Sequence, residues 1–312
     1  MKTRLFRNSL SACGIVGHHH SMHARFVFLS LILFSVPAHA AVSSPSEIVA
    51  HAPQSAWRKV APDRLLLMTT ADGKRIMIEL APEFAPVHVA NVVRLARAHA
   101  WDDGAVIRVQ DNYVVQWRVR DEKAALPRGF VEHPPAEYDR PVPGTGFRSL
   151  GYPDSYAPMA GIAAGWGVGS DGKRIWPAQC YGAVGVARDM PPDTGDGREL
   201  YVVNGEAPRQ LDRNLAVVGR VLVGMEELAA LPRGTGPLGF YTDARQNIQI
   251  KNVMLVADLP LAEQPNVQTM RTESHSFGAY VAARAARKDP FFVHAARGVA
   301  LCNVPIPSRE IR

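Results

Sequence analysis

The sequence predicts a mainly β fold, with a closed antiparallel β-barrel, two helices, a long irregular insertion and a C-terminal extension. Three observations lead to this fold class. Short apolar or alternating segments recur between residues 61 and 258, and turn residues separate them. Only two helical patterns lie among these segments, too few for the βαβ units of a parallel sheet. Residues 120–180 are rich in Pro and Gly, and the chain continues from residue 259 to residue 312 with a different pattern.

The first half of the barrel is predicted from a hairpin, a helix and two strands. Residues 65–68 and 75–80 flank an Asp-Gly turn, and the second segment alternates between apolar and polar side chains. Pro86 can open a helix at its first turn. The apolar side chains that follow it recur at helical spacing and are expected to face the sheet: Val89, Val92, Val93 and Ala96. Two strands are predicted next, over residues 106–109 and 113–117.

The second half of the barrel is predicted from four strands and a short helix. Residues 183–187, 200–203 and 215–222 have the composition of strands, and residues 225–231 fit a short helix. Residues 248–255 alternate with a slip in phase, which is typical of a β-bulge.

The segments outside the barrel are predicted to carry little regular structure. Residues 41–60 contain Ser, Pro and Ala and are expected to form a linker. Residues 120–180 are expected to form a surface excursion, because the glycines at 165, 167 and 169 lack the spacing and the following helix of a phosphate loop. The extension over residues 259–312 contains one predicted helix, whose apolar face is formed by Phe277, Tyr280, Val281 and Ala285.

An export signal is predicted at the N-terminus. Arg25 precedes an uncharged apolar run over residues 26–36, which is too short to cross a bilayer that requires about 20 apolar residues. A small-x-small pattern then predicts cleavage after Ala40, so that residues 1–40 form a signal peptide. A buried core helix is the alternative interpretation of the apolar run, and Met22 is an alternative start to Met1. The mature protein is expected to be exported, most simply to the periplasm, with no membrane insertion after cleavage.

Signal cleavage removes a charge excess that would otherwise suggest nucleic-acid binding. The full chain has 35 basic and 29 acidic residues. Residues 1–40 contain four of the basic residues and no acidic one, which leaves 31 against 29 and a formal charge of +2. A near-neutral protein has no electrostatic basis for binding a phosphate backbone, so we expect no nucleic-acid partner.

Two cysteines, Cys180 and Cys302, remain in the mature protein, and export would place them in an oxidising compartment. A disulfide between them would close a loop of 122 positions and tie the extension to the main domain. Two buried free thiols are the alternative.

The sequence contains no pattern of metal ligands, nucleophile elbow or paired carboxylates. The six histidines of the mature protein are scattered and are expected to be surface or capping residues: His51, His88, His99, His133, His275 and His294. We therefore expect neither a metal nor a cofactor, and a chemistry that needs no nucleophile.

Several segments, in order along the chain, resemble the cyclophilin-type peptidyl-prolyl cis-trans isomerases. The most specific resemblance is at residues 211–225, which follow the family's Leu-Asp-Gly-x-His-x-Val-Phe-Gly-x-Val-x-x-Gly-Met pattern through a turn, a strand and a helix start. The other matching segments are residues 78–86, 106–109, 113–116, 181–187 and 198–202. The resemblance covers about residues 63–258 apart from the insertion, and it implies a cyclophilin-like barrel.

The resemblance implies an enzyme that accelerates rotation about X-Pro bonds in proline-containing polypeptides. Arg108 is implied to be the catalytic residue, because a fixed guanidinium can favour the twisted amide over both planar states. Gln116 is implied to hold the substrate backbone through its amide. The other implied substrate-binding residues form an apolar slot for the proline ring and an adjoining groove: Tyr113, Val114, Tyr201, Leu211 and Leu215 in the slot, and Ala187 and Glu199 in the groove. Without the resemblance, Arg108 is equally a structural ion-pair residue and the slot residues are barrel core.

The sequence departs from the family at several positions that touch substrate. Glu199 stands where the family has Gln, and Leu215 where it has His; Ile107, Arg188 and Gln210 are further departures. Glu199 could pair with Arg108 and reduce its effect, or could select a basic substrate residue. These departures leave two alternatives open: a catalytically weak or inactive module that binds proline-containing segments, or a partner-docking surface on the insertion and extension beside a vestigial groove. The oligomeric state is not predicted.

Overall fold

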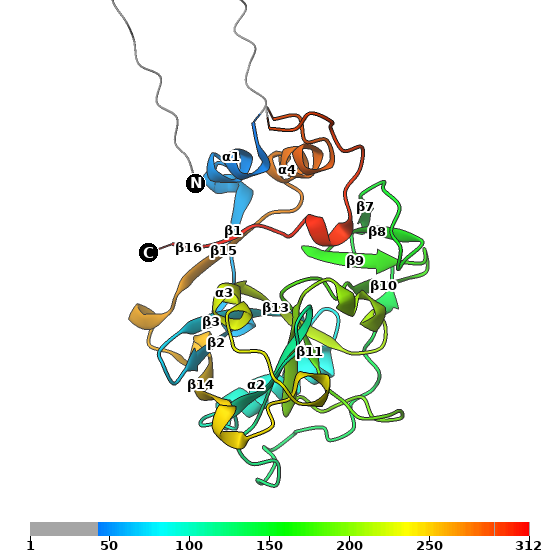
Figure 1. Cartoon of the computed structure of the whole chain (residues 1–312). Helices are drawn as coiled ribbons and strands as arrows, with labels where there is room; N and C mark the ends of the chain where they lie inside the picture. Colours follow the sequence, from blue (N-terminus) through cyan, green and yellow to red (C-terminus); the bar gives the residue numbers. More distant parts are fainter. Residues whose placement is uncertain (1–42, 290, 312) are drawn as a thin grey trace, which may run out of the picture. The chain divides into compact units, whose positions relative to one another are not determined.

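The computed structural model describes residues 43–289 and 291–311, and the predicted signal peptide lies outside these residues. Its central feature is a closed barrel of eight antiparallel strands (Figure 1). In spatial order the strands are β11 (Ala183–Val186), β12 (Glu199–Asn204), β5 (Tyr113–Arg118), β4 (Ala105–Val109), β14 (Ile248–Leu255), β2 (Leu65–Thr70), β3 (Arg75–Leu80) and β13 (Val217–Val223). The prediction of a closed antiparallel barrel is therefore confirmed.

The barrel is filled by one face of each strand, as period-2 alternation requires. On β5 the side chains of Val115 and Trp117 point inward, and on the neighbouring β12 those of Leu200 and Val202 do the same. The pairing of β14 with β2 shifts register between Ile250 and Asn252, which confirms the predicted bulge.

Two helices complete the barrel domain, as predicted. The first, α2 (Pro86–Arg97), begins with proline at its first turn and buries an apolar face against the barrel core. The second, α3 (Met225–Ala229), follows Gly224, whose φ of 87° places it in the left-handed region. A side chain there would also press on the backbone of Arg75 and Ile76, so the Gly-Met helix start requires glycine.

The prediction that residues 120–180 are irregular is wrong over much of their length. They contain an antiparallel five-stranded sheet in the order β6 (Arg140–Pro141), β10 (Arg174–Pro177), β9 (Trp166–Ser170), β8 (Met159–Ala163) and β7 (Arg148–Ser149). Its apolar face packs Trp166, Val168 and Ile175 against Phe84, at the entrance to α2. The glycines hide the strand pattern, because the backbone at Gly169 lies directly under the Trp176 indole and leaves no room for a side chain.

The prediction of a linker over residues 41–60 is also wrong. These residues contain α1 (Pro45–Ala50) and β1 (Trp57–Lys59), and both belong with the C-terminal extension. The strand β1 pairs with β15 (Asn266–Met270), which in turn pairs with β16 (Ser308–Ile311). The helix α1 packs against α4 (His275–Ala285), so that the two helices lie side by side in Figure 1.

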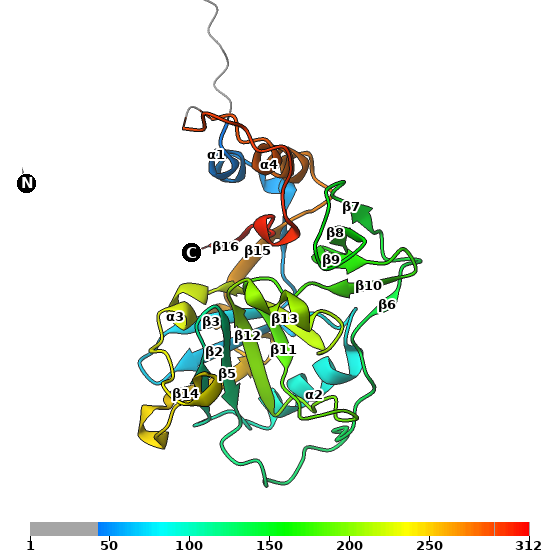
Figure 2. The ribbon, with the colours of Figure 1, turned by 45° about the vertical axis from the view of Figure 1, so that its right-hand side comes forward.

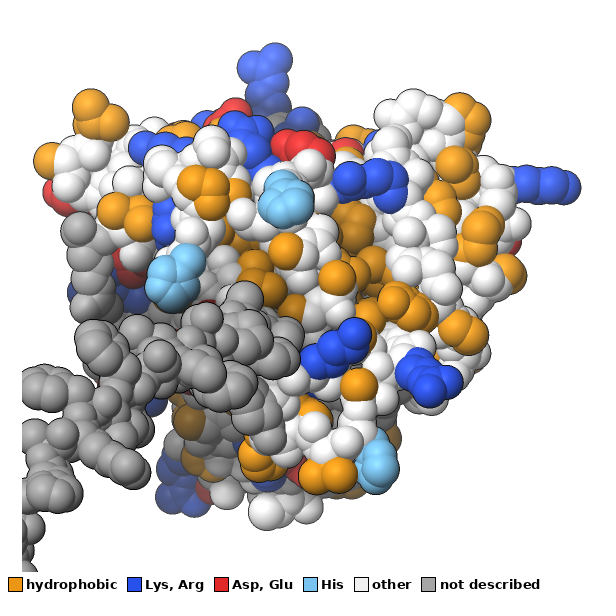
Figure 3. Space-filling model, turned by 90° about the horizontal axis from the view of Figure 1, so that it is seen from above, with side chains coloured by type: hydrophobic (Ala, Val, Ile, Leu, Met, Phe, Trp, Pro, Cys, Tyr) orange, Lys and Arg blue, Asp and Glu red, His pale blue; other side chains and the backbone are white. Residues whose placement is uncertain are grey.

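The helix of the extension has the predicted buried face. Phe277, Tyr280 and Ala285 are buried, with the partly buried Val281 beside them. The segment before the barrel and the C-terminal extension therefore build one small layer around a shared apolar cluster. Seen from the end that carries α1 and α4, the surface has hydrophobic side chains in small groups among polar and charged ones (Figure 3).

A buried carboxylate joins this terminal layer to the barrel. Glu79 on β3 is fully buried and binds Arg58 on β1 at 2.7 Å and Arg220 on β13 at 2.6 Å. Burial would raise the pKa of Glu79, but Arg220 and Arg58 more than offset it, and the pKa lies below its usual range. Arg220 also lies over the Trp166 ring, so the same cluster includes the inserted sheet.

None of the helices among the described residues is both long and apolar enough to span a membrane.

Candidate functional site

The predicted site lies on the outer face of the barrel, where β11, β12 and β5 run side by side (Figure 2). Because Val115 and Trp117 of β5 fill the interior, the alternating residues Val114 and Gln116 point outward. The cross-strand partners of Gln116 and Arg118 on β12 are Tyr201 and Glu199. A groove of about 800 Å³ runs over this face and is lined by Arg108, Gln116, Ala187 and Glu199, all predicted from the sequence.

Arg108 is held firmly at the edge of the groove. Its Nε donates to the Leu238 carbonyl at 2.6 Å, its Nη1 donates to Gln116 Oε1 at 3.0 Å, and its Nη2 donates to Gln110 Oε1. The guanidinium also lies 5.4 Å from the Tyr113 ring centre and 5.2 Å from that of Phe240. Burial lowers the pKa of Arg108 from its ordinary value, but arginine remains charged near neutral pH. The result is a fixed positive charge on the groove.

The contacts of Glu199 bear on one of the two roles that the sequence leaves open for it, a direct pair with Arg108. Gln116 stands between the two charged groups, because its Oε1 accepts from Arg108 and its Nε2 donates to Glu199 Oε1. Among the described residues, no ion pair joins Arg108 to Glu199. Burial raises the pKa of the Glu199 carboxyl, and the nearby Glu122 and Asp189 act in the same direction.

An apolar patch adjoins Arg108 and Gln116. It is formed by Tyr113, Val114, Ala187, Tyr201 and Leu215, which share one cluster with Ala183 and Val203. Leu211 lies outside this cluster, half-buried at the end of the 3-10 helix η3 (Ala207–Leu211). The structure thus brings together every predicted slot residue except Leu211.

Tyr201 is fixed in this patch from two sides. Its hydroxyl donates to Gln179 Oε1 at 3.1 Å, and burial raises the pKa of this hydroxyl above its ordinary value. Its ring lies over Gly185, the residue paired with it on β11. Any Cβ at position 185 would overlap the Tyr201 ring and hydroxyl, so glycine is required for the ring to occupy this place.

We expect Gly185→Ala to impair the site more than the fold. The new methyl group would push Tyr201 out of the apolar patch, which we expect to weaken binding of a proline peptide by about tenfold through lost apolar contact. The measurement is peptide affinity by NMR titration, with unfolding in urea as the stability control. Gly278→Ala is the comparison variant, since nothing lies within 4 Å of a Cβ there and its φ, like that of Gly185, is not in the left-handed region. Equal peptide affinity in the wild type and Gly185→Ala would contradict this account.

Sequence reasoning missed the groove residues that come from loops. Leu238 and Phe240 line the groove from the segment after α3. This segment pairs with β4 through an antiparallel β-bridge between Arg108 and Phe240. Gln110 follows β4 and holds the second terminal nitrogen of Arg108. The only available signal was the Gly-Pro-Leu-Gly-Phe turn at residues 236–240, which carries no periodic pattern.

The prediction that every histidine is a surface or capping residue is wrong for His88. It is fully buried, and its Nδ1 lies 2.7 Å from the Glu137 carboxylate of the insertion. The same carboxylate accepts the backbone N–H groups of Val87 and His88 and so caps the first turn of α2. Within residues 43–289 and 291–311, no three His, Cys, Asp or Glu side chains gather in a way that could hold a metal ion.

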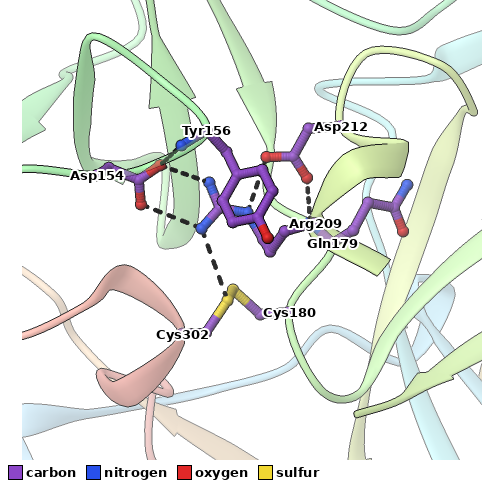
Figure 4. The surroundings of a disulfide bond; sticks show 7 residues. All are labelled: Asp154, Tyr156, Gln179, Cys180, Arg209, Asp212 and Cys302. Carbon is purple, nitrogen blue, oxygen red and sulfur yellow. Dashed lines mark hydrogen bonds and ion pairs between the residues drawn. A yellow bond between two sulfur atoms is a disulfide. The ribbon is translucent and has the colours of Figure 1, made fainter. Parts of the chain in front are cut away.

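The structure joins Cys180 and Cys302 in a disulfide, which ties the extension to the segment before β11. Arg209 lies beside it, only 4% exposed, between Asp154 at 2.8 Å and Asp212 at 2.9 Å (Figure 4). Asp212 also accepts the backbone N–H of Gln179, the residue that holds Tyr201. A continuous set of polar contacts therefore connects the disulfide region to the apolar patch.

Comparisons with known proteins agree with the barrel fold. Residues 65–255 match the sequence model of the family described as cyclophilin type peptidyl-prolyl cis-trans isomerase/CLD. The chain is 26% identical over 175 residues to proteins described as probable peptidyl-prolyl cis-trans isomerases in Brucella suis biovar 1 and Brucella abortus, covering 56% of this chain and 74% of each relative. The crystal structure of cyclophilin AquaCyp293 from Hirschia baltica has the same fold, with a TM-score of 0.63 and 23% identity, covering 82% of this chain and 93% of that chain.

Proposed function

The chain belongs to the cyclophilin-type peptidyl-prolyl cis-trans isomerases, and we propose that it acts on exported, proline-containing polypeptides through Arg108. Family membership makes the chain a peptidyl-prolyl cis-trans isomerase. The choice of substrate and the role of Arg108 are the parts that we propose here.

The proposed mechanism needs neither a covalent step nor a proton transfer. Rotation about an X-Pro bond crosses a barrier of about 20 kcal/mol, because the nitrogen lone pair is delocalised in the planar amide. At the twisted transition state this lone pair returns to nitrogen. A guanidinium that is already in place can donate to that nitrogen or to the neighbouring carbonyl, and it stabilises the twisted state more than either planar state.

The observation that carries this proposal is the fixation of Arg108 beside the apolar patch and Gln116. Three acceptors use three of the five N–H donors of the guanidinium. Two N–H donors therefore remain for a substrate. Little conformational entropy of the Arg108 side chain is lost when a substrate binds, because the guanidinium is already fixed. The proline ring would enter the patch over its partly exposed members Tyr113 and Leu215, while Gln116 binds the adjacent peptide group.

Export rests on the predicted signal peptide. The run over residues 26–36 and the site at Ala40 support secretion into an oxidising compartment, where the Cys180–Cys302 pair would remain joined. The mass of the protein recovered from the cell envelope tests this part. A chain that begins at residue 41 is expected, and an uncleaved chain confined to the cytoplasm would contradict it.

A binding module without turnover is the second candidate function. It is favoured by the engagement of Arg108 and Gln116 with protein acceptors, since a substrate must compete with these contacts or rearrange them. Such a groove could hold a proline segment without stabilising its twisted form.

NMR exchange spectroscopy on residues 41–312 with a short X-Pro peptide distinguishes the two functions. The isomerase is expected to speed cis/trans exchange far beyond the uncatalysed rate, which has a time scale of about tens of seconds. Binding shifts without faster exchange at the proline would favour the module and refute the catalytic proposal.

A further inference from the structure

We propose that Glu199 makes the groove selective for substrates that carry Lys or Arg close to the proline. This inference rests on the proposed function and adds a substrate class to it. Its basis is the unbalanced charge of Glu199, its burial and its place in the same groove as Arg108.

The Glu199 carboxylate has no cationic partner among the described residues. Its one recorded side-chain hydrogen bond comes from the neutral amide of Gln116. Arg118, its cross-strand neighbour, lowers the pKa of Glu199 as a nearby charge but forms no ion pair with it, because the Arg118 guanidinium binds Glu122 at 3.2 Å. Arg108, the cation fixed at the edge of the groove, is separated from Glu199 by Gln116.

The position is costly for an anion that has no partner. Burial raises the pKa of Glu199, which means that the surroundings disfavour its charged form. A partly buried carboxylate gains more from a cation than an exposed one does, because less water screens the pair. A substrate ammonium or guanidinium placed here would supply the missing charge.

The groove gives a substrate side chain access to Glu199. The same cavity of about 800 Å³ is lined by Arg108, Gln116 and Glu199, so a polypeptide with its proline at Arg108 passes the carboxylate. Two of the arginines that line the rest of the cavity are engaged by the protein. Arg198 binds Asp196 at 2.7 Å, and Arg188 donates to the backbone carbonyls of Asn214 and Asp189.

The experiment measures isomerisation of matched peptides that differ in one residue near the proline. Lys, Gln or Glu is placed in turn at each of the three positions before the proline and the one after it, and each uncatalysed rate is subtracted. At one of these positions the wild type is expected to prefer Lys to Glu in kcat/KM by about tenfold, the size of a charge-assisted contact. In Glu199→Gln, kcat/KM is expected to fall for the Lys peptide and rise for the Glu peptide.

Glu132→Gln is the matched control, because Glu132 lines the same groove but is exposed. It is expected to change the Lys-to-Glu ratio by less than about twofold, as for a screened surface charge. Opposite changes for the two peptides cannot come from a general structural defect. An equal Lys-to-Glu ratio in the wild type and Glu199→Gln at every position would overturn the inference.

The outcome is separable from that of the proposed function. If no peptide is isomerised, the catalytic proposal fails, and dissociation constants of the same peptides from NMR titration still decide the charge preference. If the Gln peptide is isomerised and Lys is not preferred, the function holds and the inference about Glu199 fails.

Discussion

Arg108→Ala is expected to lower kcat/KM for X-Pro isomerisation by about 100-fold or more, the loss seen when a preorganised transition-state donor is removed. The guanidinium is fixed before substrate arrives, by Leu238 on one side and by Gln110 and Gln116 on the other. Alanine removes the donors and the positive charge together. The measurement is the exchange rate of a proline peptide at saturating and subsaturating concentrations.

Two comparison variants separate the specific effect of the Arg108 guanidinium from the effect of any positive charge in the groove. Arg108→Lys keeps the charge but loses the planar fork, so an intermediate rate is expected. Arg188→Ala removes a guanidinium that lines the same groove but is held by backbone carbonyls, and it is expected to reduce the rate much less. Arg108 points away from the barrel interior, so the unfolding midpoint of Arg108→Ala should stay close to that of the wild type. Equal exchange rates in Arg108→Ala and wild type would remove Arg108 from the mechanism.

The strands of the candidate site could be predicted because their side chains differ between the two faces of the barrel. On β5, Val115 and Trp117 fill the interior while Gln116 points outward, and the family resemblance places Gln116 and Arg108 on neighbouring strands. The loop contribution could not be predicted in the same way. Leu238 meets Arg108 across 130 residues of sequence, and a contact of this range leaves no local pattern.

The inserted sheet and the terminal layer were missed for a different physical reason. One cross-strand contact between β9 and β10 is made by Trp176, which covers Gly169, so one of these two partners has no apolar side chain to count. The strand β1 is three residues long and gains its pairing from β15, more than 200 residues later. Residues 45–59 form α1 and β1 through contacts with α4 and β15, and the local sequence gives no sign of these distant partners.

Cys302→Ser is expected to lower the free energy of unfolding by about 4–5 kcal/mol. The Cys180–Cys302 bond spans 122 positions, and the chain-entropy account gives a value near 4.7 kcal/mol for a closed loop of about 100 residues. Without it, the extension from β15 onward relies on the apolar cluster around Phe277 and Tyr280 and on the pairing of β1 with β15. Urea unfolding followed by Trp fluorescence is the measurement.

The disulfide acts as a unit, and this gives the prediction a strict control. Cys180→Ser, Cys302→Ser and the double variant should lose the same stability, because each removes one and the same bond. A dithiol reductant should bring the wild type to the same free energy of unfolding and leave the variants unchanged.

Loss of the disulfide is also expected to affect the apolar patch. Gln179, next to Cys180, holds the Tyr201 hydroxyl, so peptide affinity should fall in all three variants while Arg108 keeps its acceptors. Losses far below about 4 kcal/mol in all three variants, with no effect of the reductant on the wild type, would refute the anchoring role of the bond.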